Sequence, residues 1–91
     1  HTHVPTSDYR IMENGTAYQT DIGMCGDYDS VIGMNKKNSI KRFFKDISAK
    51  KHFPSDGEAS ICGLIIKADT STGLAKKIDQ LIIGGKLKEK K

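Results

Sequence analysis

The sequence predicts a small α+β fold, and three observations lead to that class. One segment has the apolar spacing of an amphipathic helix, about three segments have the composition of strands, and residues rich in glycine and aspartate separate them. The chain has 91 residues and a mass of 10.0 kDa, so it holds at most one small domain. No apolar run approaches the ~18 residues that a membrane span needs, and we therefore expect no membrane partner.

The helix is predicted around residues 40–47. Four apolar side chains follow positions i, i+3, i+4 and i+7 and form one stripe: Ile40, Phe43, Phe44 and Ile47. Asn35 or Asn38 is suited to cap the start of this helix. Pro54 and Gly57 mark the latest point at which it can stop.

Strands are predicted at residues 16–22, 58–67 and 74–83. In the first, Tyr18, Thr20 and Ile22 alternate with other side chains, as they do in a strand. The other two should pair as an antiparallel C-terminal hairpin around a turn at residues 69–73. Residues 61–66 are apolar on both faces, which is typical of a strand covered on both sides.

The remaining segments are predicted to be irregular. Residues 1–14 have turn formers and no regular period, and the loop at 23–30 needs unusual backbone angles because it holds two glycines and two aspartates besides other polar residues. We expect a mobile Lys-rich tail at residues 86–91. Cys62 is expected in the core and Cys25 as a free thiol in a polar loop, and two cysteines cannot make a disulfide framework.

The net charge of +4 is unevenly distributed. Residues 1–30 carry five acidic side chains and one Arg, whereas residues 35–51 carry seven basic side chains and one Asp. The basic segment between Lys36 and Lys51 is suited to a nucleic acid or another anionic partner. The interpretation as a solvated helix face is favoured, because 13 of the 15 basic residues are Lys and the aromatic and glycine signals of nucleic-acid modules are absent.

Two imidazoles at the start of the chain are the sharpest chemical signal. His1 and His3 point to the same side of an extended segment, where they can reach one metal ion or two adjacent ions. An H-x-H pair also arises by chance or as the remnant of a tag, and spacing alone leaves that open. The aspartates of the loop after Asp21 are candidates to bind a metal or orient its ligands, with ordinary turn chemistry as the alternative.

The motifs together resemble the YmdB-like branch of the calcineurin-like metallophosphoesterases. Members carry the segment G-T-H-T-H-V-P-T-A-D, and residues 1–8 of this chain read H-T-H-V-P-T-S-D, with Ser7 in place of the usual Ala. A second family segment, G-T-A-Y-x-T-D-x-G-M-x-G-x-Y-D-S-V-I-G-M, is matched by residues 15–34. Arg42 and Phe43 match the R-F pair of the family helix, and a D-x-x-T-G turn follows at residues 69–73.

The resemblance implies that the chain is the C-terminal portion of a calcineurin-like αββα sandwich, with residues 1–85 as part of the metallophosphoesterase domain. It also implies a phosphoesterase that hydrolyses phosphodiesters, cyclic nucleotides among them, with two divalent or mixed-valence metal ions (Fe, Mn or Zn). His1 and His3 match the H-x-H metal ligands. The other ligands and the general acid His are expected upstream, so the chain alone should hold no catalytic residue and be inactive.

Further expectations concern the surroundings of the site and the partners. The residues expected to line the substrate loop or to orient the metal ligands are Asp8, Asp21, Gly23, Met24 and Gly26. The resemblance implies a cytoplasmic enzyme. The exposed hairpin edge is suited to augment a sheet in a homo-oligomer. The competing function is a small basic module that binds nucleic acid or another anionic partner through residues 36–51.

Overall fold

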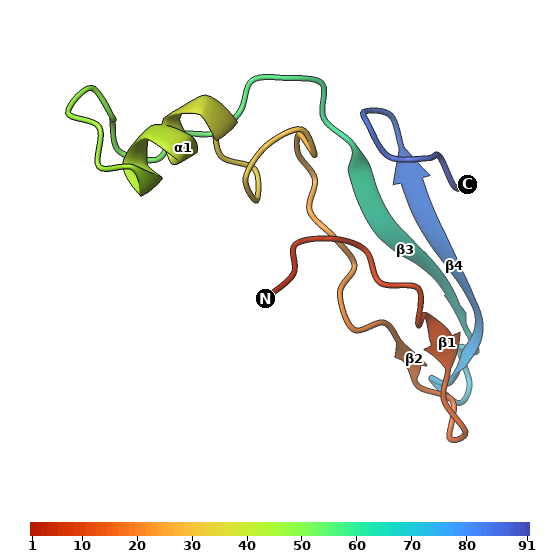
Figure 1. Cartoon of the computed structure of the whole chain (residues 1–91). Helices are drawn as coiled ribbons and strands as arrows, with labels where there is room; N and C mark the ends of the chain where they lie inside the picture. The colour runs from red at the N-terminus through yellow and green to blue at the C-terminus, as the bar shows by residue number, and fades with distance from the viewer.

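A computed structural model describes residues 1–91 and confirms the predicted α+β class (Figure 1). It contains one helix and two antiparallel hairpins. The elements in chain order are β1 (Arg10–Ile11), β2 (Ala17–Tyr18), α1 (Lys36–Phe43), β3 (Ile61–Ala68) and β4 (Ala75–Ile83). With eight residues, α1 is far shorter than the ~20 residues that cross a bilayer, and the structure has no helix suited to a membrane span.

The long hairpin of β3 and β4 matches the prediction closely. The two strands pair from Ile61 opposite Ile83 to Ala68 opposite Ala75, with an irregularity after Lys67. The turn between them is built by Asp69, whose carboxylate accepts hydrogen bonds from the amides of Ser71 at 2.8 Å and Thr72 at 3.2 Å. Residues 1–91 cover β3 only in part, because Cys62 is buried whereas the side chains of Ile61, Ile65 and Ile66 are about half exposed, and cover on both faces stays a prediction.

The short hairpin of β1 and β2 corrects the prediction. Only Ala17 and Tyr18 of the expected strand at 16–22 are in a strand, and they pair with Arg10–Ile11, a part of the chain predicted to be irregular. The strand ends early because side chains take over as hydrogen-bond acceptors. The amide of Thr20 donates to Asp8 Oδ1 at 3.2 Å, and the amide of Asp21 donates to Thr6 Oγ1 at 3.1 Å.

The helix forms where it was expected but ends sooner. Asn35 caps it, accepting a hydrogen bond from the amide of Asn38 at 2.9 Å. The predicted apolar stripe ran to Ile47, whereas α1 ends at Phe43. Lys45 has a φ of +56°, which no helical residue has, and the Asp46 carboxylate then accepts from the amide of Ser48 in a local turn.

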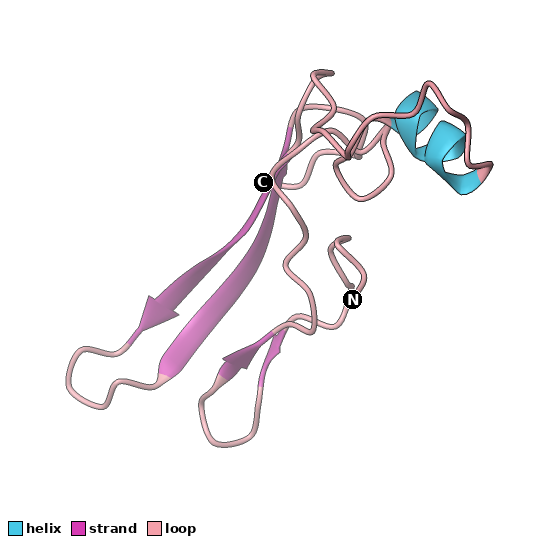
Figure 2. Ribbon diagram, turned by 90° about the vertical axis from the view of Figure 1, so that its left-hand side faces the viewer, coloured by secondary structure: helices cyan, strands magenta, loops and turns pink.

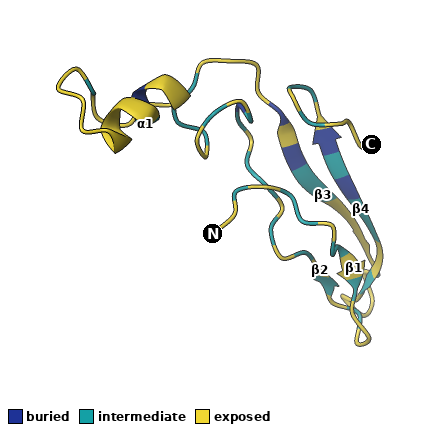
Figure 3. Ribbon diagram, viewed as in Figure 1, coloured by how far each residue is buried: buried dark blue, intermediate teal, exposed yellow.

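The molecule is elongated, with α1 at the opposite end from the turns of the two hairpins (Figure 2). It measures 59 × 22 × 19 Å. Its radius of gyration is 17.3 Å, against about 12 Å for a compact domain of this length. Only six side chains are buried, and four of those are polar (Figure 3). The buried apolar side chains are Cys62 on β3 and Ile82 on β4, so the small core sits on the long hairpin.

The C-terminal tail lies against the end of β4. The amide of Ile82 donates to the carbonyl of Lys90 at 2.7 Å, and the amide of Lys90 donates back at 2.9 Å. The Lys90 ammonium also bonds the hydroxyl of Tyr9 and lies 4.5 Å from the centre of its ring. Residues 86–91 therefore have defined contacts in this structure, and their predicted mobility stays a prediction.

Candidate functional site

The two histidines at the start of the chain lie side by side. The ring centres of His1 and His3 are 4.2 Å apart, and the ring planes are inclined by 31°. The prediction assumed an extended chain, but His3 has a φ of +61°, in the left-handed region. The pair therefore forms through a bend in the backbone.

Asp21 holds the residue between these histidines. Its carboxylate accepts a hydrogen bond from the hydroxyl of Thr2 and another from the amide of Gly23 at 2.8 Å. These bonds, the Thr2 hydroxyl first, lower the pKa of Asp21. The structure thus brings Asp21 to the histidine segment, where it fixes the backbone that carries the imidazoles.

Asp8 is bound to a different group of atoms. Its carboxylate accepts from the hydroxyl and the amide of Thr20 and from the hydroxyl of Thr6 at 2.6 Å. These hydrogen bonds, with the Thr20 hydroxyl as the largest cause, lower its pKa to about 2. Asp8 links two segments of backbone, and its partner Thr6 is in turn bonded to Asp21, because the Asp21 amide donates to Thr6 Oγ1 at 3.1 Å.

The glycine loop that starts at Gly23 packs closely against other parts of the chain. Gly23 has a φ of +94°, and a Cβ atom there would lie 2.9 Å from Cδ of Pro5. Gly26 exchanges two backbone hydrogen bonds with Ser60, at 3.0 and 2.8 Å. The amide of Met24 donates to the hydroxyl of Tyr28 at 2.9 Å. The unusual backbone angle expected of this loop is confirmed at Gly23, and its proximity to a substrate stays a prediction.

Tyr28 and Asp27 are contacts that sequence reasoning missed. The Tyr28 hydroxyl lies 3.3 Å from the carbonyl oxygen of His3 and 3.3 Å from Sγ of Cys62. Burial, and then the bond to Cys62, raises the pKa of Tyr28 to about 12, so the hydroxyl keeps its proton. Asp27 is buried and accepts from the hydroxyl of Ser55. The G-x-Y-D-S segment already contained both residues, but nothing in their spacing indicated these partners.

The cysteines and His52 lie as expected. Both thiols are free, Cys62 is buried in the long hairpin and Cys25 is exposed. His52 is exposed beyond α1, as predicted for a surface residue near the helix end. It takes no part in the histidine pair, which leaves it available as a control position.

The donor set fits part of a transition-metal site. Two adjacent imidazoles are suited to ions such as Fe and Zn. Within residues 1–91, no three side chains of His, Cys, Asp or Glu converge on one point, and Asp21 is engaged by Thr2 and Gly23. The pair would hold a metal ion only together with further ligands.

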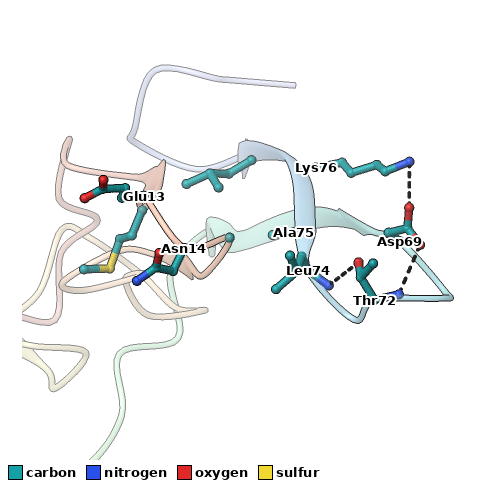
Figure 4. Close-up of a pocket in the computed structure, with 10 residues that line it drawn as sticks. Glu13, Asn14, Asp69, Thr72, Leu74, Ala75 and Lys76 are labelled. Carbon is teal, nitrogen blue, oxygen red and sulfur yellow. Dashed lines mark hydrogen bonds and ion pairs between the residues drawn. The ribbon is translucent and has the colours of Figure 1, made fainter.

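The largest pocket, of about 570 Å³, lies elsewhere (Figure 4). It lies where the turn of the short hairpin meets that of the long one, beside the hydrogen bond from the Ala75 amide to the carbonyl of Gly15 at 2.8 Å, and it contains none of the predicted site residues. Its polar groups bond one another: Lys76 pairs with Asp69 at 3.0 Å, and the amide of Leu74 donates to Thr72 Oγ1 at 3.2 Å. This pocket is a gap between two turns, and the histidine pair remains the stronger candidate site.

Comparisons with known proteins agree with the motifs. A model of the family described as YmdB-like protein matches residues 1–81. A 2',3'-cyclic-nucleotide 2'-phosphodiesterase of Bacillus subtilis is 41% identical over 83 residues, which cover 91% of this chain and 31% of that protein. The chain thus spans about a third of the length of that relative.

Solved structures give the same result for the fold. A crystal structure of a phosphatase from Mycoplasma pneumoniae aligns with a TM-score of 0.79 and 39% identity, covering 92% of this chain and 30% of that one. A crystal structure of a hypothetical protein from Thermus thermophilus aligns with a TM-score of 0.75 and 30% identity. The alignment covers 94% of this chain and 33% of the Thermus protein. The fold observed here is therefore part of a larger phosphatase-type fold, and the chain belongs to the YmdB-like protein family.

Proposed function

We propose that this chain is the C-terminal portion of a two-metal phosphoesterase that hydrolyses phosphodiesters, with cyclic nucleotides as the candidate substrates. Membership of the YmdB-like family and the activity named for the Bacillus relative support the reaction class. The observation that carries the proposal is the placement of His1 and His3, whose ring centres lie 4.2 Å apart. Two imidazoles this close offer donors to one metal ion or to two neighbouring ions.

In this proposal each residue of the segment has a separate task. His1 and His3 would hold the metal ions, which we take to be Fe, Mn or Zn. When bound, such ions supply Lewis-acid stabilisation of the oxygens around the phosphorus atom. Asp21, through the hydroxyl of Thr2, keeps the intervening backbone fixed. Because two imidazoles do not complete a metal site, residues 1–91 by themselves should be inactive.

We propose that the enzyme acts in the cytoplasm and that other parts of the protein complete its site. Two free cysteines and no disulfide suit a reducing compartment, and we place the enzyme in the cytoplasm. The metal ligands and the general acid that complete the reaction would come from the rest of the protein.

The test replaces His3 in the intact protein. His3→Ala should lower the metal content by about one ion per chain, because one imidazole ligand is lost. It should reduce hydrolysis of bis(p-nitrophenyl) phosphate and of a 2',3'-cyclic nucleotide by more than about 100-fold, since loss of even an outer partner of a metal site costs about 10–100-fold. His52→Ala is the matched control and should leave both values unchanged. Normal metal content and rate in His3→Ala would refute the ligand assignment.

A second candidate function is binding of a nucleic acid or another anionic partner. Lys37, Lys41 and Lys50 surround a small pocket of about 150 Å³ beside α1. Replacing the three with Gln should weaken binding to a 20-nucleotide RNA and lower the salt slope by up to about two. No binding of this RNA at low salt by the unaltered protein would sink this second function.

A further inference from the structure

Tyr28 connects the glycine loop to the histidine segment. Its hydroxyl accepts a hydrogen bond from the amide of Met24 at 2.9 Å, which fixes the oxygen within the loop. The same oxygen lies 3.3 Å from the carbonyl oxygen of His3, 25 residues earlier in the chain. A phenolic hydroxyl accepts and donates at once, and its one proton is shared between the carbonyl oxygen of His3 and that of Met24, which lies at 3.1 Å.

Gly23 creates the space in which this hydroxyl sits. A Cβ atom on Gly23 would lie 2.9 Å from the Tyr28 oxygen and 3.1 Å from Cβ of Cys62. Only the absence of a side chain therefore lets the hydroxyl pass between the loop and β3 to reach His3. On the far side the oxygen is 3.3 Å from Sγ of Cys62.

His3 needs an external hold because of its backbone. Its φ of +61° is uncommon for residues other than glycine, although histidine adopts it more often than most, and such a conformation persists where neighbouring contacts impose it. Hydrogen bonds hold the backbone at His3 itself and at the residue before it. Asp21 accepts from the hydroxyl of Thr2 before His3, and Tyr28 reaches the carbonyl of His3 itself.

We propose that Tyr28 is a positioning residue for the metal ligand His3. Its hydroxyl, seated against Gly23, holds the His3 carbonyl and so keeps the left-handed backbone that places the two imidazoles side by side. This inference rests on the proposed function, because it gives His3 the role of a ligand. In this role Tyr28 does not contact the substrate. The role differs from simple packing of the ring because it depends on the hydroxyl oxygen alone.

The deciding variant is Tyr28→Phe in the intact protein, since it keeps the ring and removes the oxygen. We expect the affinity of the metal-free protein for Mn²⁺, measured by titration calorimetry, to fall about tenfold, as for other groups that orient metal ligands. The melting temperature of the metal-free protein should change by no more than about 3 °C. Gly23→Ala, which pushes against the same hydroxyl, should lower the affinity further.

Tyr18→Phe is the matched control. Tyr18 is exposed, and its hydroxyl bonds only Thr20, at 3.1 Å, so its loss should leave the affinity for Mn²⁺ unchanged. An equal loss in Tyr18→Phe and Tyr28→Phe would overturn the positioning role. So would a Tyr28→Phe protein that has unfolded without metal, because the tyrosine would then serve stability alone.

His3→Ala separates this inference from the proposed function. If His3→Ala loses Mn²⁺ while Tyr28→Phe binds it as tightly as the unaltered protein, His3 is a ligand and Tyr28 does not position it. If His3→Ala binds Mn²⁺ normally, the ligand assignment itself is wrong and the positioning role falls with it. Weakened binding in both variants, with a folded metal-free protein, supports both.

Discussion

The hairpin body and the helical arm of this molecule are held together in different ways. The hairpin body comprises residues 1–34 and 54–91, with the histidine segment and β1–β4, and its bonds join residues that are far apart in the chain, as between Gly26 and Ser60. The helical arm, residues 35–53, closes on itself. Its buried side chain is Asn38, whose amide group donates to the carbonyl of Lys50 at 3.1 Å and whose oxygen accepts from the Lys50 amide at 2.9 Å.

The burial of apolar residues also differs between the hairpin body and the helical arm. In the hairpin body Cys62 and Ile82 are buried, whereas the stripe on the arm faces outward, with Phe43 and Phe44 80% and 75% exposed. A helix of this length is marginal without a partner for its apolar face. Local signals thus shape the arm, while long-range contacts shape the body, and we expect the arm to open first in native-state hydrogen exchange.

The largest loss of stability is expected where the segment after β4 packs against the segment before β3. Gly85→Ala should destabilise the intact protein by about 2–4 kcal/mol, because the new Cβ would collide with Oγ of Ser60 and lie 2.8 Å from its amide nitrogen. Ser60 is fully buried, and its hydroxyl donates to the carbonyl of Gly84 at 2.8 Å, so a shift of Ser60 would break this bond. Chemical denaturation measures the change in unfolding free energy.

Gly73→Ala is the control that isolates the collision. Gly73 has a φ of +74°, close to the +69° of Gly85, but a Cβ atom there meets nothing within 4 Å. Its replacement should therefore cost only the left-handed backbone, about 1–2 kcal/mol. Equal losses at the two glycines would show that the Ser60 contact contributes nothing and that the body is looser than its bonds indicate.

The elements that the sequence predicts well are those with local causes. The helix start follows from Asn35, and the long hairpin follows from two apolar runs around the Asp69 turn. The short hairpin escaped prediction because β1 has only two residues and no alternation of its own. Strand β2 ends early because the Asp8 carboxylate accepts a hydrogen bond from the amide of Thr20, 12 residues later in the chain.

The candidate site likewise has residues that the sequence indicates and contacts that it does not. The H-x-H spacing and the family resemblance point to His1 and His3, whose rings lie 4.2 Å apart, and their role as metal ligands stays a prediction. The contact from Tyr28 to the His3 carbonyl could not be predicted, because it joins two loops whose approach depends on Gly23. Backbone that bonds to a distant side chain leaves no periodic signal in a sequence.

An intermediate effect is expected at the start of the arm. Asn35→Ala removes the side-chain oxygen that accepts from the Asn38 amide and should destabilise α1 by about 1 kcal/mol. Amide exchange in residues 36–43 would report it, with no change in the protection of β3 and β4. Ser39→Ala is the control, because its hydroxyl is buried without a partner and its loss should not weaken the helix. Loss of protection in the hairpins would show that the arm and the body are one cooperative unit.

The smallest effect concerns Asp8 and appears only in acid. Its pKa in the folded chain is about 2, below the ordinary 3.8, because the hydroxyls of Thr20 and Thr6 donate to the carboxylate. A lowered carboxyl pKa adds stability that is fully present above about pH 4 and is lost as the pH falls through 2. Thr20→Val should raise the Asp8 pKa towards 3.8 and flatten the loss of stability between pH 4 and 2.

Carbon-detected NMR titration of the Asp8 carboxyl measures this directly. Thr16→Val is the control, since Thr16 is exposed and its hydroxyl does not bond Asp8. Because the carboxylate also accepts from the Thr20 amide, the pKa in Thr20→Val should still lie somewhat below 3.8. An Asp8 pKa near 3.8 in the unaltered protein would mean that these hydroxyls do not bind the carboxylate in solution. The body would then lose a long-range link that distinguishes it from the arm.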